Sequence, residues 1–174
     1  IKNNGGNAIL TSKNHKTGTD RIYEAYNMLG RNDIDFVMNI QGDEPEIDIN
    51  DIKNLDNKMK KNSSKIGTLA ATIANSKVYE NENIVKVQTK ESFDQNSFPY
   101  AENFMRKTKN MNGIFHHIGI YCNGVETLKR FILFNQSSNE LKNRLEQLRD
   151  IDNNIEINVT IANSSPIVIN KTEN

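Results

Sequence analysis

The sequence predicts an α/β fold in which a mixed, mostly parallel sheet lies between two layers of helices. Short apolar segments rich in β-branched residues alternate along the chain with longer segments that have helical periodicity. The apolar run at 36–40 stops abruptly at Gly42, two carboxylates and Pro45, which indicates a buried strand that ends in a tight turn. Since open α/β sheets bind ligands at the carboxyl ends of their strands, this turn is the first candidate for a functional site.

Four helices are expected, and the spacing of apolar residues supports each of them. In the first, Ile22, Ala25, Tyr26 and Leu29 lie on one face, and Gly30 suits the end of the helix. The predicted helices cover residues 20–29, 48–61, 125–134 and 140–150.

Six strands are expected between these helices. Residues 155–161 alternate strictly between apolar and polar side chains, as in a half-buried strand. The strand at 35–40 is expected at the centre of the sheet, and the polar segment 107–112 predicts an exposed loop. We expect one domain that spans residues 1–174. The predicted strands cover residues 8–11, 35–40, 68–73, 85–89, 114–121 and 155–161.

The composition excludes several classes of function. The 22 basic and 22 acidic residues cancel, so no net charge attracts nucleic acid or an anionic membrane. No apolar run approaches the roughly 20 residues that cross a bilayer, and no signal peptide is visible. The single Cys122 cannot form an internal disulfide, which is typical of a reducing compartment. These observations predict a cytoplasmic protein without membrane insertion.

Gln41 and Asp43 are the strongest candidates for chemistry, because they follow the strand at 35–40. A carboxylate at a strand end can hold Mg²⁺, a hard cation that prefers oxygen ligands. Asp, Gly and Pro are also common turn residues, so an acidic surface turn is the alternative, and composition alone favours it.

The segment before the first helix carries a second set of candidates. Thr17, Gly18 and Thr19 can present backbone amides to a base or an anion at the helix start. They can also form a plain N-cap without a ligand. Arg21 is either a ligand-binding residue or a structural ion-pair partner.

Two later segments carry the remaining candidates. His117 and Tyr121 are four residues apart in a predicted strand, which puts both on one face. Gly119 between them leaves room for a ligand. The imidazole of His117 can bind a carboxylate of that ligand, and the phenol of Tyr121 can bind a hydroxyl. A histidine packed in the core is the alternative. Glu146 and Gln147 can face the hydroxyls of a sugar, or form a solvated helix surface.

Four ordered motifs together give a more specific indication. They are H-K-T-G-T-D-R at 15–21, V-M-N-I-Q-G-D-E-P at 37–45, H-I-G-I-Y at 117–121 and L-E-Q-L-R at 145–149. In this order they resemble the bacterial CMP-Kdo synthetases, the 3-deoxy-manno-octulosonate cytidylyltransferases. That family typically reads H-x-S-G-T-[DE]-R, V-N-[VI]-Q-G-D-E-P, H-x-G-I-Y and L-E-Q-L-R. The resemblance runs from about Gly5 to the last residue.

The resemblance implies a three-layer, Rossmann-like fold of the nucleotide-diphospho-sugar transferases. It implies a nucleotidyl transfer in which CTP activates Kdo to CMP-Kdo and pyrophosphate, for lipopolysaccharide biosynthesis. It also implies Mg²⁺ as cofactor, CTP and Kdo as small-molecule partners, and a homodimer. Asp43 would be the catalytic metal ligand, and Asn170 stands where the family has a second metal-binding Asp. The nucleotide would be bound by Thr17, Gly18, Thr19 and Arg21, and the sugar by Gln41, His117, Tyr121, Glu146 and Gln147.

The chain also departs from the family's pattern. It begins at Ile1, and we expect it to lack the family's first strand and the Gly/Arg/Lys-rich loop for the triphosphate, because it contains no phosphate-binding glycine motif. The neutral Asn170 would bind Mg²⁺ less strongly than a carboxylate. The chain is therefore expected to make CMP-Kdo very slowly or not at all. Two alternatives stay open: a non-catalytic, degenerate domain that binds sugar, nucleotide or a partner subunit, and a cytidylyltransferase for another acidic sugar.

Overall fold

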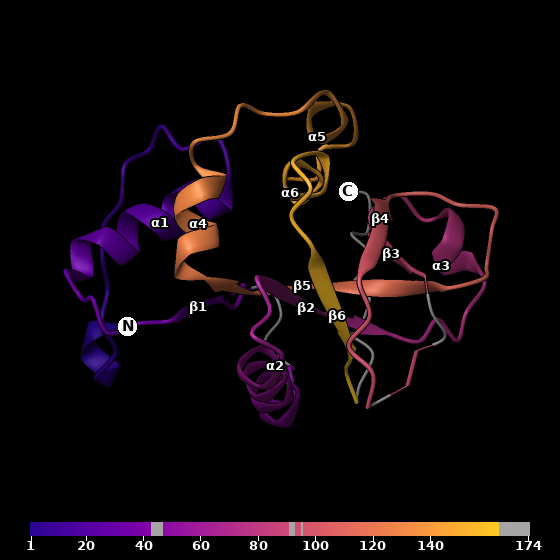
Figure 1. The fold of residues 1–174 in the computed structure, drawn as a ribbon, viewed down its shortest axis with the longest axis horizontal. Coiled ribbons are helices and arrows are strands. Elements are labelled where there is room, and N and C mark those ends of the chain that lie inside the picture. The colour runs from indigo at the N-terminus through magenta and orange to yellow at the C-terminus, as the bar shows by residue number, and fades with distance from the viewer. Residues whose placement is uncertain (43–46, 91–92, 95, 164–174) are drawn as a thin grey trace.

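A computed structural model describes residues 1–42, 47–90, 93–94 and 96–163 (Figure 1). A short 3₁₀ turn, η1 (Lys2–Asn4), precedes the first helix. None of the helices in these ranges combines the length and the apolar character needed to span a membrane. The helices are α1 (Gly18–Leu29), α2 (Ile49–Asn62), α3 (Lys77–Glu80), α4 (Val125–Phe131), α5 (Ser138–Asn143) and α6 (Leu148–Asp152). The strands are β1 (Phe36–Asn39), β2 (Ile66–Ala71), β3 (Lys86–Thr89), β4 (Ala101–Met105), β5 (Ile114–Gly124) and β6 (Ile157–Ile161).

The long strand β5 organises the sheet. The described strands run in the order β4-β3-β5-β2-β6, and β1 also pairs with β5. Strands β1, β2 and β3 are all antiparallel to β5, whereas β2 and β6 are parallel. The sheet is mixed, as predicted, but the expected preponderance of parallel pairs is wrong. The reason is that β5 lies between β2 and β3, which share one direction, and is antiparallel to both.

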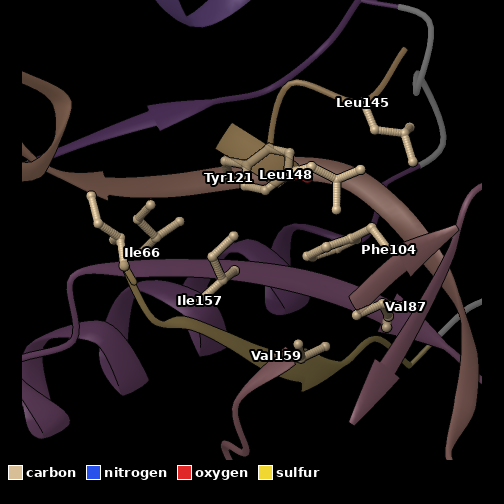
Figure 2. Packing of buried hydrophobic residues seen from close by; sticks show 10 residues of the cluster. Ile66, Val87, Phe104, Tyr121, Leu145, Leu148, Ile157 and Val159 are labelled. Atoms are coloured by element: carbon tan, nitrogen blue, oxygen red, sulfur yellow. The ribbon is translucent and has the colours of Figure 1, made fainter. Parts of the chain in front are cut away.

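Helices cover both faces of the sheet, which gives the predicted three layers. Helix α2 lies on one face, and α1, α4, α5 and α6 lie on the other (Figure 1). Leu55 and Met59 of α2 pack with Leu69 of β2 and Ile120 of β5. Burial of each such side chain contributes roughly 1.5–3 kcal/mol to stability. A second buried cluster lies on the opposite face of the sheet and includes Leu145 and Leu148 (Figure 2). Its residues are Ile66, Ala70, Val87, Phe104, Tyr121, Leu145, Leu148, Ile155, Ile157 and Val159.

Strand β5 contains a bulge. The register of β2 against β5 jumps between Thr68 and Leu69 and leaves Gly119 and Ile120 without partners on β2. Side chains alternate along a strand with a period of two, so an insertion of two residues keeps later side chains on their original faces. His117 therefore shares a face with the residue four positions later, as predicted.

Three further strand predictions need correction. Residues 8–11 form no strand, and three of the four are exposed. The strand at 35–40 is not central, because β1 pairs only with the end of β5 among the described strands. Strand β4 was not predicted, because its sequence A-E-N-F-M lacks an alternating pattern.

The last predicted helix is in fact two helices, α5 and α6. Arg144 adopts a left-handed conformation with φ of 54°, and the N–H of Leu145 donates to the carbonyl of Glu140 (3.2 Å). The guanidinium of Arg106, at the end of β4, donates to the carbonyls of Asn143 (2.9 Å) and Arg144 (3.0 Å). These bonds satisfy the last carbonyls of α5, which would otherwise favour continuation of the helix.

Candidate functional site

The start of α1 is held by a capping box. Thr17 Oγ1 accepts a hydrogen bond from the backbone N–H of Asp20 (3.3 Å), and Asp20 Oδ2 accepts one from the backbone N–H of Thr17 (3.0 Å). Two donors that a helix start leaves free are thereby satisfied. The predicted N-cap is confirmed, and it gives the loop before α1 a defined shape.

Glu146 reaches the same helix start from the segment between α5 and α6. Its carboxylate accepts hydrogen bonds from the backbone N–H (3.3 Å) and the hydroxyl (3.0 Å) of Thr19. A carboxylate is favoured there because the outward-pointing amides make a helix start electropositive. Two motifs that lie 127 residues apart in the sequence therefore meet at one point. Glu146 is half-buried, so the alternative of a solvated helix surface is wrong for this residue.

Arg149 ties together the helices around this point and is only 2% exposed. It donates two hydrogen bonds to Glu140 (2.8 and 2.5 Å), lies 3.8 Å from the Asp20 carboxylate, and stacks 4.1 Å from the centre of the Phe131 ring. Burial favours a higher pKa for Glu140, but hydrogen bonds from Arg149 and Gln136 outweigh it and lower that pKa. Arg149 is therefore a buried residue that supports the site.

Two cavities open beside this network. One, of about 650 Å³, lies between α1 and the segment that follows α4. The other, of about 380 Å³, is lined by Thr17 and Glu146. Lys16 and Gln136 line both, so the two cavities are neighbours. The polar groups at the start of α1 therefore border open volume that a base or a sugar can enter.

Gln41 follows β1 and lies over β5. A Cβ added at Gly119 would lie 3.3 Å from Gln41 Nε2 and 3.5 Å from its Cδ, so glycine permits this close approach. Strand β1 pairs with β5 as far as Tyr121, and β3 pairs with β5 as far as His116. Gln41 therefore covers the part of β5 that lies between these two strands.

His117 is 8% exposed, and its Nε2 lies 2.9 Å from Thr68 Oγ1. Its ring packs edge-on against Phe104, with 5.1 Å between ring centres, and lies 5.3 Å from the ring of Tyr121. Burial, with a smaller contribution from His116, lowers the pKa of His117 to about 3. The imidazole is therefore neutral at physiological pH. It is a packed core residue, and it also shares a face with Tyr121.

Tyr121 and Asp150 carry buried polar atoms without partners. Neither the Tyr121 hydroxyl nor Asp150 Oδ1 forms a hydrogen bond within the described part of the chain. Burial, followed by the carboxylates of Glu146 and Asp150, raises the pKa of the Tyr121 phenol. Burial and Glu146 raise the pKa of Asp150 to about 8, although Arg149 opposes the shift. Unpaired buried groups cost free energy and cluster at functional sites.

Two other predicted site residues, Gln147 and Arg21, occupy positions that support the local structure. Gln147 is 6% exposed at the N-cap of α6. Arg21 donates from Nη1 to the hydroxyl of Thr11 (2.6 Å) and to the carbonyl of Ser12 (3.0 Å), so it holds the segment before α1. Their roles as substrate-binding and nucleotide-binding residues stay predictions.

Asp43 and Asn170 lie outside the described residues, so their metal-binding roles also stay predictions. Within the described ranges, no group of three or more His, Cys, Asp and Glu side chains is arranged to hold a metal ion.

Sequence reasoning missed two residues of this region. Thr68 contacts His117 from the neighbouring strand, and a threonine in an apolar strand gives no signal of that contact. Asp150 directly follows the L-E-Q-L-R motif, and its burial depends on how α6 packs against the sheet. Only the three-dimensional arrangement identifies either residue.

Comparisons with known proteins give this arrangement a context. A family model described as cytidylyltransferase matches residues 1–157. The chain is 38% identical over 173 residues to the 3-deoxy-manno-octulosonate cytidylyltransferase of Thermodesulfovibrio yellowstonii, which covers 93% of this chain and 68% of the relative. It is 37% identical over 166 residues to that of Afipia carboxidovorans, with 94% and 66% covered. The chain thus spans about two thirds of the length of these relatives.

Solved structures show the same relationship. The structure of CMP:2-keto-3-deoxy-manno-octonic acid synthetase complexed with CTP matches with a TM-score of 0.78 and 27% identity, over 93% of this chain and 66% of that chain. The 4-diphosphocytidyl-2C-methyl-D-erythritol synthase of Anaerococcus prevotii matches with a TM-score of 0.52 and 12% identity, over 88% of this chain and 58% of that chain. At such low identity, the second match concerns the fold alone.

Proposed function

Because this chain belongs to the cytidylyltransferase family, we propose that it activates Kdo by transfer of the cytidylyl group from CTP. The observation that carries the proposal is the contact of Glu146 with Thr19, which joins two motifs beside an open cavity. The relatives named 3-deoxy-manno-octulosonate cytidylyltransferase favour this function over a non-catalytic domain or another acidic sugar.

The start of α1 is proposed to receive the cytosine base. The carboxylates of Asp20, Glu140 and Glu146 lie around this point. Arg149 offsets part of their charge, and the remaining negative charge would repel a triphosphate, so an uncharged base suits the adjoining cavity better. Lys16 lines the same cavity and supplies a positive charge at its border.

The face of β5 is proposed to receive the sugar. Gln41 offers an amide over Gly119, and Tyr121 offers a hydroxyl that has no partner in the described structure. Glu146 influences the Tyr121 phenol through its charge while it holds the start of α1, so it links the two halves of the site. A sugar bound there would lie next to the nucleotide.

The proposed reaction exchanges the phosphoanhydride bond between the α- and β-phosphates of CTP for a phosphate ester bond to the sugar. The 2-hydroxyl oxygen of Kdo attacks the α-phosphorus of CTP, the bond from that phosphorus to pyrophosphate breaks, and the hydroxyl proton passes to solvent. The residues of this chain contribute by orienting the two substrates, which converts a bimolecular reaction into an effectively intramolecular one. A homodimer and a role in lipopolysaccharide synthesis remain predictions from the resemblance, and the cytoplasmic location remains a prediction from the sequence.

Mg²⁺ is part of the proposal through the chemistry of its donors. Asp43 would supply a carboxylate and Asn170 an amide oxygen, and the ion would neutralise charge on the phosphates. Asp43→Asn is expected to abolish Mg²⁺ binding in the presence of CTP, whereas Asn170→Asp is expected to strengthen it. Calorimetric titration at fixed ionic strength measures both. Unchanged binding in Asp43→Asn would exclude this residue as a ligand.

The function is tested by pyrophosphate release from the protein as its gene encodes it. We expect release that requires both CTP and Kdo, with CMP-Kdo as the second product. Turnover with a different acidic sugar and not with Kdo would favour the substrate alternative. Binding of CTP or Kdo without turnover would favour the non-catalytic domain.

A further inference from the structure

The hydroxyl of Thr68 lies among three polar neighbours on the sheet. Its Oγ1 is 2.9 Å from Nε2 of His117, 2.7 Å from the carbonyl oxygen of Ile120 and 3.4 Å from that of Ile118. Thr68 is completely buried. A hydroxyl has one proton to donate, so it can make only one of these bonds as a donor.

The bulge in β5 decides where that proton goes. Ile120 has no register partner on β2, and its carbonyl oxygen lies 2.7 Å from the Thr68 hydroxyl, a separation at which one of the two oxygens must donate a hydrogen bond. A carbonyl oxygen can only accept, and Thr68 supplies the donor at 2.7 Å. The hydroxyl therefore turns a lone pair toward His117, and Nε2 of His117 carries the ring proton.

A neutral imidazole with its proton on Nε2 keeps a lone pair on Nδ1. No hydrogen bond joins Nδ1 to any residue that the structure describes. The imidazole lies on the same face of the sheet as Tyr121, with 5.3 Å between the two ring centres. Gln41 lies over Gly119 on this face. Burial disfavours a second proton on the ring, as the pKa of about 3 indicates. An uncharged acceptor binds a hydroxyl, whereas it has no proton to offer a carboxylate at that nitrogen.

We propose that Thr68 is a positioning residue that holds His117 as the neutral Nε2–H tautomer, so that Nδ1 accepts a hydrogen bond from a hydroxyl of the sugar. This inference rests on the proposed function and names the group of the substrate that His117 recognises. It replaces the expectation that the imidazole binds a carboxylate. The carboxylate of the sugar then needs donors elsewhere, and the amide of Gln41 is one of them.

The tautomer is measured directly by NMR on the protein labelled with ¹⁵N-histidine. We expect Nε2 of His117 to give the signal of a protonated ring nitrogen and Nδ1 that of an unprotonated one at neutral pH. The chain has three histidines, and the His15→Asn and His116→Asn variants assign their signals. A proton on Nδ1, with or without one on Nε2, overturns the proposal.

Two substitutions test the role of the hydroxyl. Thr68→Val removes it with little change of shape, and Thr68→Ser keeps it. We expect the KM for Kdo to rise about tenfold in Thr68→Val, with kcat and the KM for CTP little changed, and to return to within about twofold in Thr68→Ser. The proposal is overturned if Thr68→Val lowers kcat and raises both KM values to a similar extent while the tautomer of His117 stays the same. If Thr68→Val does not fold, the labelled parent protein decides.

Addition of Kdo to the labelled protein separates this inference from the proposed function. We expect the Nδ1 signal of His117 to shift toward that of a hydrogen-bonded nitrogen as Kdo binds. Calorimetric binding of Kdo without a change at Nδ1 overturns the inference and leaves the proposed function in place. Absence of Kdo binding in the presence of CTP overturns both.

Discussion

The two halves of the candidate site are built in opposite ways. At the start of α1, the polar groups are paired with one another, as Thr19 is with Glu146. At the other half, the hydroxyl of Tyr121 on β5 and Oδ1 of Asp150 on α6 are buried without partners among the described residues. The first half is therefore held in shape by its own hydrogen bonds. The second keeps polar groups away from water at a cost in free energy, which a hydrogen-bonding ligand can offset.

Removal of Arg149 should break the paired half most severely. Arg149→Met leaves Glu140, which is 3% exposed, without its cation. We expect the free energy of unfolding to fall by roughly 3–5 kcal/mol, because an uncompensated buried charge is costly. Urea unfolding measures the loss. Lys129→Met is the matched control, since it removes an exposed ion pair with Glu126 and should change stability little. Equal effects would contradict a buried supporting role for Arg149.

Asp150, in the half of the site with unpaired polar groups, should make the stability of the protein depend on pH. Its pKa is raised by burial to about 8 in the folded protein, whereas an unfolded Asp titrates near about 3.9. The folded state therefore binds the proton more tightly. The resulting stabilisation of the folded state is complete below about pH 4 and is lost as the pH rises through about 8. The free energy of unfolding falls by at most roughly 1.4 kcal/mol per pH unit in this range.

Asp150→Asn should remove this contribution to the pH dependence. Urea unfolding of the parent and the variant between about pH 5 and 8 measures the slope of stability against pH. Asp152→Asn, at an exposed position of the same helix, is the control and should keep the parent's slope. An identical slope in Asp150→Asn would show that the carboxyl is ionised throughout this range.

Glu146 is the residue at which the two halves meet, so its substitution should affect both. Glu146→Gln keeps the size of the side chain but loses the charge and one of the two acceptors for Thr19. We expect the KM for CTP to rise about tenfold, the equivalent of about 1.4 kcal/mol. The same substitution should lower the pKa of Asp150, because the Glu146 carboxylate raises it. Steady-state kinetics and the stability slope measure the two effects. Glu156→Gln, at an exposed position, is the control.

The smallest effect is expected at Gly119. In Gly119→Ala the new methyl group would lie 3.3 Å from the Gln41 amide, and this flexible side chain can move by a few tenths of an ångström. Stability should change by less than about 0.5 kcal/mol, while the KM for Kdo rises about threefold. Gly42→Ala, where the added Cβ would lie more than 4 Å from the described residues, should leave both unchanged. A loss of stability in Gly119→Ala would indicate that the bulge itself needs glycine.

Much of the fold could be predicted because it depends on local patterns. The helical spacing of α1, its cap at Thr17 and a strand over Ile157–Ile161 are properties of a few consecutive residues, and the structure confirms them. The predicted half-burial of the last strand is wrong, because the polar residues Asn158 and Thr160 are buried as well. Leu29 on the apolar side of α1 is exposed. The common face of His117 and Tyr121 follows from the period of a strand and survives the bulge because the insertion has two residues.

Other features could not be predicted because distant residues produce them. The residues around Arg144 have helical spacing and no glycine or proline, yet the helix ends there because Arg106 binds its last carbonyls. Arg149 has the sequence context of a surface residue, but Glu140 and Asp20 surround it in the folded protein.

The sequence by itself determined the family of this chain and supplied the candidate site residues, because motifs and local periodicity are properties of consecutive residues. The tertiary structure decided what state those residues adopt. The imidazole of His117 is neutral because burial disfavours its charged form, and Thr68 contacts it from the neighbouring strand beside a bulge in β5. Charge and protonation depend on the surroundings of a group in space, which a linear pattern does not contain.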